Sequence, residues 1–379
     1  MKKILVIHNK YKMLGGEDVA VNTEISVLHE NFEVKVIYFD NKKINILSDL
    51  FTFIFNKNPK SLRKLKKEIK NFNPELIYVH NTWYKASVAI FNFLKKQNIQ
   101  TIIKLHNFRY DCTRHYLMRN HMRELNFCLK CGLTKKGFLN KYFQDSFIKS
   151  FLMIRYGKKY YKILQNPKFK IIVLTEFHKQ YLIKIGLNEN KIYTVHNPID
   201  ISTQNNELLS DYIVYAGRIS KEKGVHELIS SYIDAQLKSI NLKLIGEGPD
   251  LARLKSRYLS NNKIEFLGKL DNLHTKTIIS RSKAVVTATK LFEGQPTLLC
   301  EASSLGIPSI FPKFGGIHEF FPDKTSLSFE QFNYQDLTLK IKMLETIDMT
   351  KEGTSNKKFL SKYFDKQKFI EKFNAVIND

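Results

Sequence analysis

Short, nearly continuous apolar runs recur along the chain, and a longer segment of mixed polarity follows each of them. In the first half, the runs cover residues 4–7, 34–39, 76–79, 101–105, 171–174 and 192–195 and are rich in β-branched residues. Strands that are buried on both faces of a parallel sheet have this composition. The segments between them, such as 19–28 and 62–69, have apolar residues at helical spacing. This alternation predicts an α/β fold with a doubly wound parallel sheet.

The same pattern starts again after residue 210. A second series of runs covers residues 212–216, 242–245, 264–267, 284–287 and 308–311. Residues 197–207, between the two series, are polar and lack clear periodicity, which is typical of a linker. The pattern therefore predicts two Rossmann-like domains, 1–200 and 201–361. Residues 362–377 again have helical spacing and are predicted as a final helix within the segment 362–379.

The two halves of the chain differ in charge. The sequence has 61 Lys and Arg against 36 Asp and Glu, a formal charge of +25. Residues 1–200 hold 36 of the basic residues and only 15 of the acidic ones. This excess indicates an acidic partner for the first domain, which is a nucleic acid, an anionic membrane surface or an acidic substrate. The chain has no basic-aromatic recognition motif and no zinc-finger spacing, so we expect no nucleic-acid partner.

The remaining composition excludes several classes of protein. With 43% hydrophobic and 26% charged residues in 379, the chain is neither disordered nor fibrous. Four cysteines are too few for a disulfide scaffold and fit a reducing compartment. No apolar run approaches the roughly 20 residues of a membrane-spanning helix. The first run ends after four residues, which is too short for a secretory signal, so we expect a cytoplasmic protein.

The segment after the strand predicted at 284–287 carries two glutamates. A loop holds Glu293, Gly294 and Pro296, a helix begins near Thr297, and Glu301 lies about one turn into that helix. The N–H groups at the start of a helix bind anions, and carboxylates at the carboxyl ends of strands suit sugar hydroxyls. The alternative is that Glu293 only starts the helix and that Glu301 is a solvated surface residue.

A basic loop follows the strand predicted at 212–216. Gly217 and Arg218 end the strand, and Lys221, Lys223 and Gly224 precede a predicted helix over 225–233. Two fixed cations at the end of a strand can stabilise a departing pyrophosphate. The alternative is an ordinary basic surface loop.

Two further candidates follow strands of the first domain. Gly15 and Gly16 come after the first strand, in a loop of the kind that approaches phosphates, although a tight turn explains them equally well. The chain lacks a full G-x-G-x-x-G fingerprint there, so we expect neither NAD nor FAD. His106 follows the fourth strand, where it is either functional or a hydrogen-bonded structural residue.

Taken together, these motifs resemble family 4 of the retaining glycosyltransferases, whose GT-B fold has two Rossmann-like domains with the active site in the cleft between them. The resemblance runs along nearly the whole chain, with a departure at Thr175, where the family usually has serine. The motifs that carry it are Gly15-Gly16, His106-Asn107, Val173-Leu-Thr-Glu176, Val195-His-Asn197-Pro-Ile-Asp200, Ala216-Gly-Arg218 with Lys223-Gly224, Leu244-Ile-Gly246-Glu-Gly248-Pro249, and Glu293 with Glu301 as the family's E-x7-E.

The resemblance implies a role for each matching residue. Arg218 and Lys223 would bind the donor's diphosphate, and Glu301 would hold the ribose hydroxyls. Glu293 would lie beside the donor sugar, and His106 would contact the sugar that is transferred. The family usually needs no divalent metal, and its final helix commonly crosses back to the first domain. The other donor-binding residues would be Gly15, Gly16, Gly217, Gly294, Gln295, Pro296 and Thr297.

A separate cluster could hold zinc. Cys112, Cys128 and Cys131 lie within twenty residues of one another, together with His115 and His121. A structural zinc site usually has two spaced ligand pairs and only one is present, so we expect no metal and keep the three cysteines as candidates. The fourth cysteine, Cys300, is predicted to lie in the core.

The sequence thus predicts a retaining hexosyl- or N-acetylhexosaminyltransferase of GT-B fold. It would move a sugar from a nucleotide-sugar donor to a glycan or lipid-linked acceptor in bacterial surface polysaccharide synthesis (lipopolysaccharide or capsule) or glycolipid synthesis. A UDP-sugar is favoured over a GDP-sugar by family frequency, and no other cofactor is required. The alternatives are a sugar-nucleotide 2-epimerase of the same fold and a basic nucleic-acid-binding protein.

The charge of the first domain further predicts that it docks on an anionic inner-membrane surface. Residues 57–70 read as a basic amphipathic helix, and residues 133–170 hold ten basic residues interleaved with aromatic ones. Basic residues attract anionic lipid, and aromatic side chains settle at the membrane interface. The alternative is a solvated lysine face over buried aromatics. We expect a peripheral protein on the inner face of the cell membrane.

Overall fold

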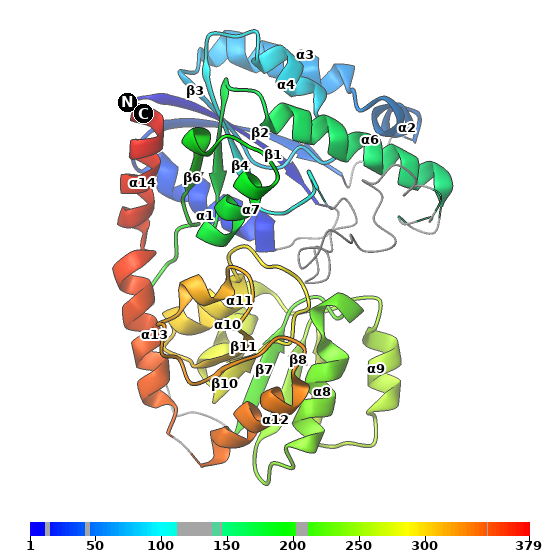
Figure 1. Cartoon of the computed structure of the whole chain (residues 1–379), viewed down its shortest axis with the longest axis vertical. Helices are drawn as coiled ribbons and strands as arrows, with labels where there is room; N and C mark the ends of the chain where they lie inside the picture. Colours follow the sequence, from blue (N-terminus) through cyan, green and yellow to red (C-terminus); the bar gives the residue numbers. More distant parts are fainter. Residues whose placement is uncertain are drawn as a thin grey trace. The chain divides into compact units, whose positions relative to one another are not determined.

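The computed structural model describes residues 1–11, 16–41, 46–111, 139, 141, 143, 146–201, 211–346 and 348–379. The chain divides into two compact units (Figure 1). The first unit is formed by Met1–Pro198 with Phe369–Asp379, and the second by Ile199–Lys368.

The first unit is built on a six-stranded sheet in the order β2-β1-β3-β4-β5-β6, with every neighbouring pair parallel. The winding direction reverses between β1 and β3, and the loops that leave these two strands therefore diverge. Doubly wound sheets bind ligands in the crevice that this divergence opens. The strands are β1 (Lys3–Lys10), β2 (Glu33–Asp40), β3 (Leu76–Val79), β4 (Gln100–Leu105), β5 (Phe169–Val173) and β6 (Ile192–Thr194).

Helices cover both faces of this sheet. Apolar residues of α1 and α14 pack with Ile4, Val6 and Tyr78 on one face, and α3, α4 and α6 lie on the other (Figure 1). Thr175 caps α7 by accepting a hydrogen bond from His178 N at 3.1 Å, which a serine hydroxyl does equally well. The helices are α1 (Gly16–His29), α2 (Ile46–Phe55), α3 (Pro59–Phe72), α4 (Ala89–Leu94), α6 (Phe147–Leu164), α7 (Glu176–Lys184) and α14 (Lys366–Asn378), with a short 3-10 turn at Glu189–Lys191.

The single final helix predicted over residues 362–377 is wrong. Helix α13 (Thr350–Tyr363) ends before Phe364, and α14 begins at Lys366. Phe364 is buried in the second unit, where its ring lies 4.9 Å from that of Phe320, whereas Phe369 is buried in the first unit. The apolar spacing across this segment therefore belongs to two different cores, and the segment through Lys368 is part of the second unit.

The second unit has a six-stranded sheet in the order β12-β11-β10-β7-β8-β9. Read from β9, this is the 3-2-1-4-5-6 order of a Rossmann fold, and its switch point lies between β7 and β10. The two-residue strand β12 was not predicted. The strands are β7 (Tyr212–Ala216), β8 (Asn241–Ile245), β9 (Ile264–Gly268), β10 (Ala284–Val286), β11 (Ser309–Pro312) and β12 (Ser328–Phe329).

Two apolar clusters lie on the two faces of this second sheet. Leu228 of α8 and Leu337 of α12 belong to one cluster, and Leu299 of α11 and Leu360 of α13 belong to the other. The prediction of two Rossmann-like α/β domains is confirmed. The remaining elements are α8 (Val225–Asp234), α9 (Leu251–Arg257), α10 (Asn272–Ser280), α11 (Thr297–Ser304) and α12 (Tyr334–Lys342), with 3-10 turns at Lys221–Lys223, Ile317–Phe320 and Met343–Glu345.

Candidate active site

The loop after β7 is held against the loop after β10, at the switch point of the second sheet. Gly224, at the start of α8, has φ +67°, and a Cβ there would lie 2.0 Å from the carbonyl oxygen of Ala288. Only glycine fits this approach. Lys290 reinforces it: its Nζ lies 2.6 Å from Glu227 Oε1, and its backbone N–H donates to the carbonyl of Glu222. The predicted residues of the two loops are thereby brought together.

Lys223 and Glu293 form an ion pair between these loops. Lys223 Nζ lies 2.5 Å from Glu293 Oε1, and the Thr289 hydroxyl donates to the same oxygen at 2.9 Å. The two side chains are 29% and 23% exposed, so the pair is half-buried and still open to a ligand. The sequence motifs gave these residues separate roles and did not predict the pairing.

Arg218 lies at the same sheet edge with its charge available. Its side chain is exposed and makes no hydrogen bond or ion pair with any other residue that the structure describes. Its backbone is fixed, because the Tyr215 hydroxyl donates to the Arg218 carbonyl at 2.8 Å. A fixed backbone with an unpaired guanidinium suits the binding of an anion.

The start of α11, which follows the neighbouring strand β10, provides backbone donors at the same edge of the sheet. Pro296 is its N-cap residue and gives no side-chain cap, so the first N–H groups from Thr297 onward have no capping side chain. The loop residues Gly294 and Gln295 are partly exposed, and Gly217 lies exposed after β7. Such a helix start attracts phosphate oxygens.

Glu301 lies one turn further along α11. Its side chain is partly buried, and this burial raises the pKa of its carboxyl above the usual value, although Lys276 acts in the opposite direction. A solvated surface glutamate would not have this environment. Cys300, the preceding residue, is buried in the core as predicted.

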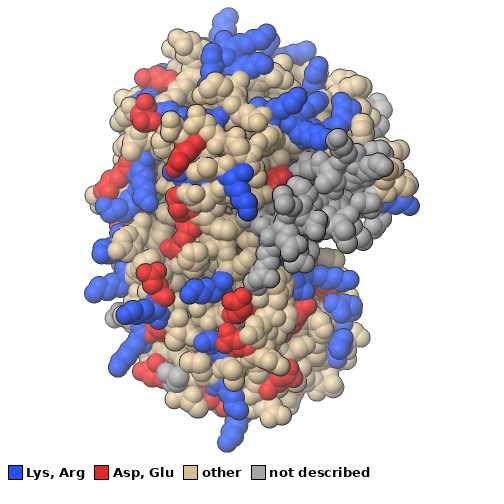
Figure 2. Space-filling model, viewed as in Figure 1, with Lys and Arg blue, Asp and Glu red and all other residues tan. Residues whose placement is uncertain are grey.

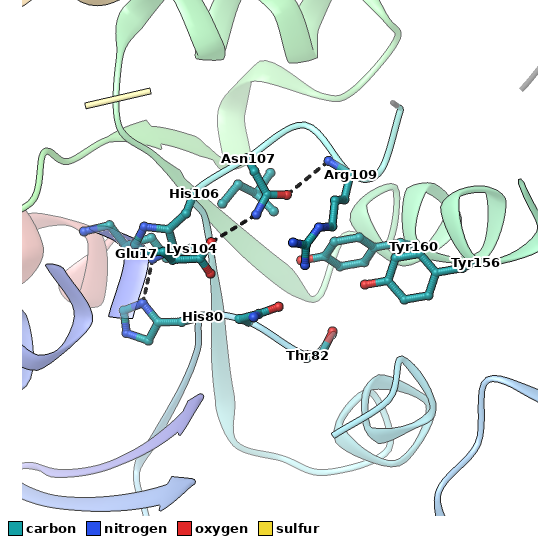
Figure 3. A pocket seen from close by; sticks show the side chains of 11 residues that line it. Glu17, His80, Thr82, Lys104, His106, Asn107, Arg109, Tyr156 and Tyr160 are labelled. Carbon is teal, nitrogen blue, oxygen red and sulfur yellow. Dashed lines mark hydrogen bonds between the residues drawn. The ribbon is translucent and has the colours of Figure 1, made fainter. Parts of the chain in front are cut away.

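In the first unit, a small polar pocket opens at the carboxyl ends of β3 and β4 (Figure 3). Asn107 donates to Glu17 Oε2 at 3.2 Å, and the Tyr11 hydroxyl donates to the same oxygen at 2.8 Å. Arg109 lies over the rings of Tyr11 and Trp83. The residues that line the pocket are Glu17, His80, Asn81, Thr82, Lys104, Leu105, His106, Asn107, Arg109, Tyr156 and Tyr160.

His106 lines this pocket and is paired with a second histidine. Nδ1 of His80 lies 2.9 Å from Nε2 of His106, and the two rings stack with their centroids 5.3 Å apart. Burial lowers the pKa of both imidazoles well below the usual range, and the nearby Lys104 cation lowers it further. Both rings are therefore neutral at physiological pH.

Lys104 itself is fully buried and paired. Its Nζ lies 2.7 Å from Glu24 Oε2, and the Tyr78 hydroxyl donates to the other carboxylate oxygen of Glu24. Burial lowers the pKa of Lys104, and Glu24 counteracts this. A buried charge is tolerated only with such a partner.

Sequence motifs found some of these residues and missed others. His80, Glu17, Arg109 and the Lys104–Glu24 pair were not predicted as site residues. The position of His80, directly after a buried strand adjacent to that of His106, was a signal that could have found it. Gly16 begins α1, next to the crevice of the first sheet. Gly15 and the zinc candidates Cys112, Cys128 and Cys131 lie outside the described residues, and the described part of the chain holds no cluster of three or more potential metal ligands.

Two family models match the chain. Residues 32–203 match the model of Glycosyltransferase Family 4, and residues 200–359 match that of Glycosyl transferases group 1. Together the two matches span most of both units. Each unit of the chain therefore matches a glycosyltransferase family model.

Curated relatives with similar sequences are glycosyltransferases too. An uncharacterized glycosyltransferase of Methanocaldococcus jannaschii is 23% identical over 260 residues, which is 61% of this chain and 64% of the relative. The O-antigen biosynthesis glycosyltransferase WbnH of Escherichia coli is 28% identical over 142 residues, which is 37% of this chain and 40% of the relative. The chain thus aligns with less than two thirds of either relative.

The fold has close counterparts among solved structures. HepE of Anabaena, determined in complex with UDP and glucose, superposes with a TM-score of 0.69 over the full length of both chains, at 15% identity. This similarity establishes the fold. No helix in the described part of the chain is long and apolar enough to cross a membrane.

Proposed function

We propose that the protein transfers a sugar from a nucleoside diphosphate sugar to a hydroxyl of a glycan, with retention of anomeric configuration. The observation that carries this proposal is the switch point of the second unit. Two cations and backbone donors meet there in adjoining loops. They are Arg218, which has no partner among the described residues, the Lys223–Glu293 pair and the start of α11, which has no side-chain cap. This combination fits a diphosphate flanked by hydroxyl-bearing groups.

The diphosphate would lie against Arg218, Lys223 and the start of α11. Cleavage of the bond between the anomeric carbon and the phosphate oxygen leaves a nucleoside diphosphate with one more negative charge, which these cations stabilise. The acceptor hydroxyl attacks the anomeric carbon from the face that the leaving group departs from. Its proton passes to the departing phosphate oxygen, so the reaction balances without an enzymic base.

Glu301 would accept hydrogen bonds from the ribose hydroxyls, and Glu293 would lie near the donor sugar. His106 in the pocket of the first unit would contact the transferred sugar, and Gly15 and Gly16 would approach the phosphates. Hydroxyl, amide and charged groups line the pocket around Asn107 and Glu17, and such groups can form hydrogen bonds with sugar hydroxyls.

The donor is proposed to be a UDP-sugar, because the similar fold of HepE binds UDP and glucose. The acceptor is proposed to be a lipid-linked glycan of a bacterial surface polysaccharide, because WbnH acts in O-antigen biosynthesis. A GDP-sugar remains the alternative donor.

The acceptor's lipid would be met at an anionic membrane surface on the cytoplasmic side. On the face shown in Figure 2, Lys and Arg side chains gather over the first unit, where α3 and α6 lie. The apolar side of α3 is turned inward, with Leu65 buried, while Lys64, Lys66 and Lys67 are exposed. These exposed lysines support electrostatic docking.

The aromatic part of this docking surface differs from the sequence-based prediction. Tyr156 and Tyr160 of α6 are buried and line the pocket, so they cannot reach a membrane. Phe147 and Phe151, at the start of the same helix, are each 46% exposed, and Arg155 lies over the Phe151 ring. These two phenylalanines are the aromatic residues of α6 that support docking.

The experiment that tests the proposed function has two stages. A thermal-shift screen with UDP-, GDP- and ADP-sugars identifies the donor, since a ligand at 100 times its Kd adds about 2.7 kcal/mol of apparent stability. The stabilising donor is then incubated with lipid-linked glycan extracts, and the anomeric configuration of the product is read by NMR. Stabilisation by none of the sugars would contradict the proposal. Interconversion of the donor without any acceptor would instead identify a 2-epimerase.

A further inference from the structure

The contact between His80 and His106 couples the hydrogen positions of the two rings. His80 follows β3 and His106 follows the adjacent strand β4. The 2.9 Å separation of His80 Nδ1 and His106 Nε2 is that of a hydrogen bond, and Figure 3 shows it at the edge of the pocket. Between two neutral imidazoles, one of these nitrogens must donate and the other must accept.

The direction of this bond follows from the other nitrogen of His80. His80 Nε2 is buried and has no hydrogen-bond partner among the described residues. A buried N–H without an acceptor is rarer and costlier than a buried lone pair without a donor. The hydrogen of His80 therefore lies on Nδ1, and it is donated to Nε2 of His106. The hydrogen of His106 must then lie on its own Nδ1.

Packing prevents His80 from turning away from this bond. His80 is only 2% exposed, and the centroids of the His80 and Tyr78 rings are 4.4 Å apart. The His8 ring lies edge-on to the His80 ring, with the two centroids 6.2 Å apart. His8 is held in turn by Asp18, whose Oδ1 lies 2.9 Å from His8 Nε2. A ring that is fixed on several sides can impose one tautomer on its neighbour.

We propose that His80 is a positioning residue that holds His106 as the Nδ1–H tautomer, so that His106 presents a hydrogen-bond donor to an oxygen of the bound sugar. The sugar ligand rests on the function proposed above, whereas the tautomer does not. In this state His106 Nε2 already accepts a hydrogen bond and Nδ1 already carries a hydrogen. His106 therefore binds an oxygen lone pair and cannot remove a proton from the acceptor.

The test compares His80→Asn with His80→Leu. Asparagine places an amide N–H close to the position of the histidine Nδ1–H, whereas leucine keeps bulk without a donor. The protein is labelled with 15N-histidine, and long-range 1H–15N spectra report which ring nitrogen is protonated. His106 signals are assigned by their loss in His106→Asn. We expect the Nδ1–H pattern in the wild type and in His80→Asn, and an Nε2–H or mixed pattern in His80→Leu.

The wild-type spectrum alone can overturn the proposal, even if His80→Leu fails to fold. An Nε2–H pattern for wild-type His106 contradicts it, and so does an unchanged Nδ1–H pattern in a folded His80→Leu. In turnover assays we expect His80→Leu to lose about tenfold in kcat, as for one hydrogen bond, and His80→Asn to restore most of it. The expected spectra from a wild-type protein that transfers no sugar would overturn the proposed function and leave this tautomer assignment intact.

Discussion

Glu293 Oε1 lies 2.5 Å from Lys223 Nζ, so a cation proposed for the diphosphate already has a carboxylate partner. An ammonium group has three donors and can hold Glu293 and a phosphate oxygen together. Arg218, by contrast, has no such partner in the described part of the chain. The two cations of this site therefore differ in what their removal leaves behind.

This difference predicts distinct results for Arg218→Ala and Lys223→Ala. Each should lower the turnover rate about a hundredfold, or about 3 kcal/mol, through loss of a preorganised charge. Only Lys223→Ala should also lower stability, by about 1 kcal/mol, because Glu293 loses its partner in a half-buried place. Initial rates and thermal unfolding measure the two effects. Adding Glu293→Gln to Lys223→Ala should recover stability without recovering rate. Full turnover in both single variants would disprove the diphosphate site.

Glu301→Gln should make the protein more stable at neutral pH while weakening donor binding. The pKa of Glu301 is raised in the folded state, so the folded protein holds this proton more tightly than the unfolded chain. Its ionisation therefore lowers the stability of the protein as the pH rises from the pKa of Glu301 in the unfolded chain to its pKa in the folded protein. The gain in Tm of the variant should grow over this pH range and be absent below it. A constant gain at all pH values would rule out titration of Glu301.

The same variant tests the roles of the two glutamates. Removal of the Glu301 carboxylate should mainly raise the KM for the donor, because the ribose is remote from the reacting carbon. Glu293→Gln should mainly lower kcat. The reverse pattern would mean that the roles are exchanged.

Gly224→Ala should destabilise the second unit far more than Gly268→Ala. Both glycines have nearly the same φ, +67° and +68°, so the conformational cost of about 1 kcal/mol is shared. Only at Gly224 would the added Cβ meet a backbone oxygen, at 2.0 Å, whereas nothing lies within 4 Å at Gly268. The overlap should cost about 2 kcal/mol more. Denaturant unfolding measures both, and equal losses would show that the loops do not approach each other closely.

Lys104→Met should destabilise the first unit by about 3 kcal/mol or more, because it leaves the buried Glu24 carboxylate unpaired. The double variant with Glu24→Gln should recover much of the loss, since a neutral amide oxygen still accepts from Tyr78. A double-mutant cycle in urea gives the coupling between the two residues. A coupling near zero would show that the pair contributes little.

Membrane docking should depend on the lysines of α3. Wild-type protein should sediment with anionic vesicles, stay in solution with neutral ones and be released by high salt. Reversing the charge of Lys64, Lys66 and Lys67 to Glu should weaken sedimentation and leave donor hydrolysis unchanged. The matched control reverses Lys351, Lys358 and Lys362 of α13, which changes the net charge equally. Equal losses of vesicle binding in the two triple variants would show that net charge alone causes the effect. If the wild-type protein bound neither kind of vesicle, docking would be disproved.

Most strands were predictable because each one is an apolar run. The inner strands β1, β3 and β7 are buried almost throughout, and a parallel strand covered on both faces has few other compositions. The two-residue strand β12 was too short to give such a signal. The break at Phe364 was missed because helical spacing continues across it, and the sequence alone does not show that Phe364 and Phe369 belong to different cores.

The site was predictable only where residues are close to a strand end in the sequence. Arg218, Glu293 and Glu301 were found in this way, but the pairing of Lys223 with Glu293 joins residues 70 positions apart. His80 follows β3 as His106 follows β4, but it was missed because the family resemblance carried by His106-Asn107 does not extend to it. Tyr156 and Tyr160 are buried because their side of α6 faces the sheet. Lysines and aromatic residues are interleaved along this segment, so the sequence did not show which side that would be.

Helix α14 gives the two units different positions in the order of synthesis. All residues of the second unit form one continuous stretch, whereas the first unit takes Phe369 and Phe373 from the last helix, beside Phe32 and Tyr78. Gln100 and Lys170 also donate hydrogen bonds to carbonyls of α14. On the ribosome, the domain that is made first therefore has an uncovered apolar face until the final segment emerges, while the domain made second has all its residues earlier.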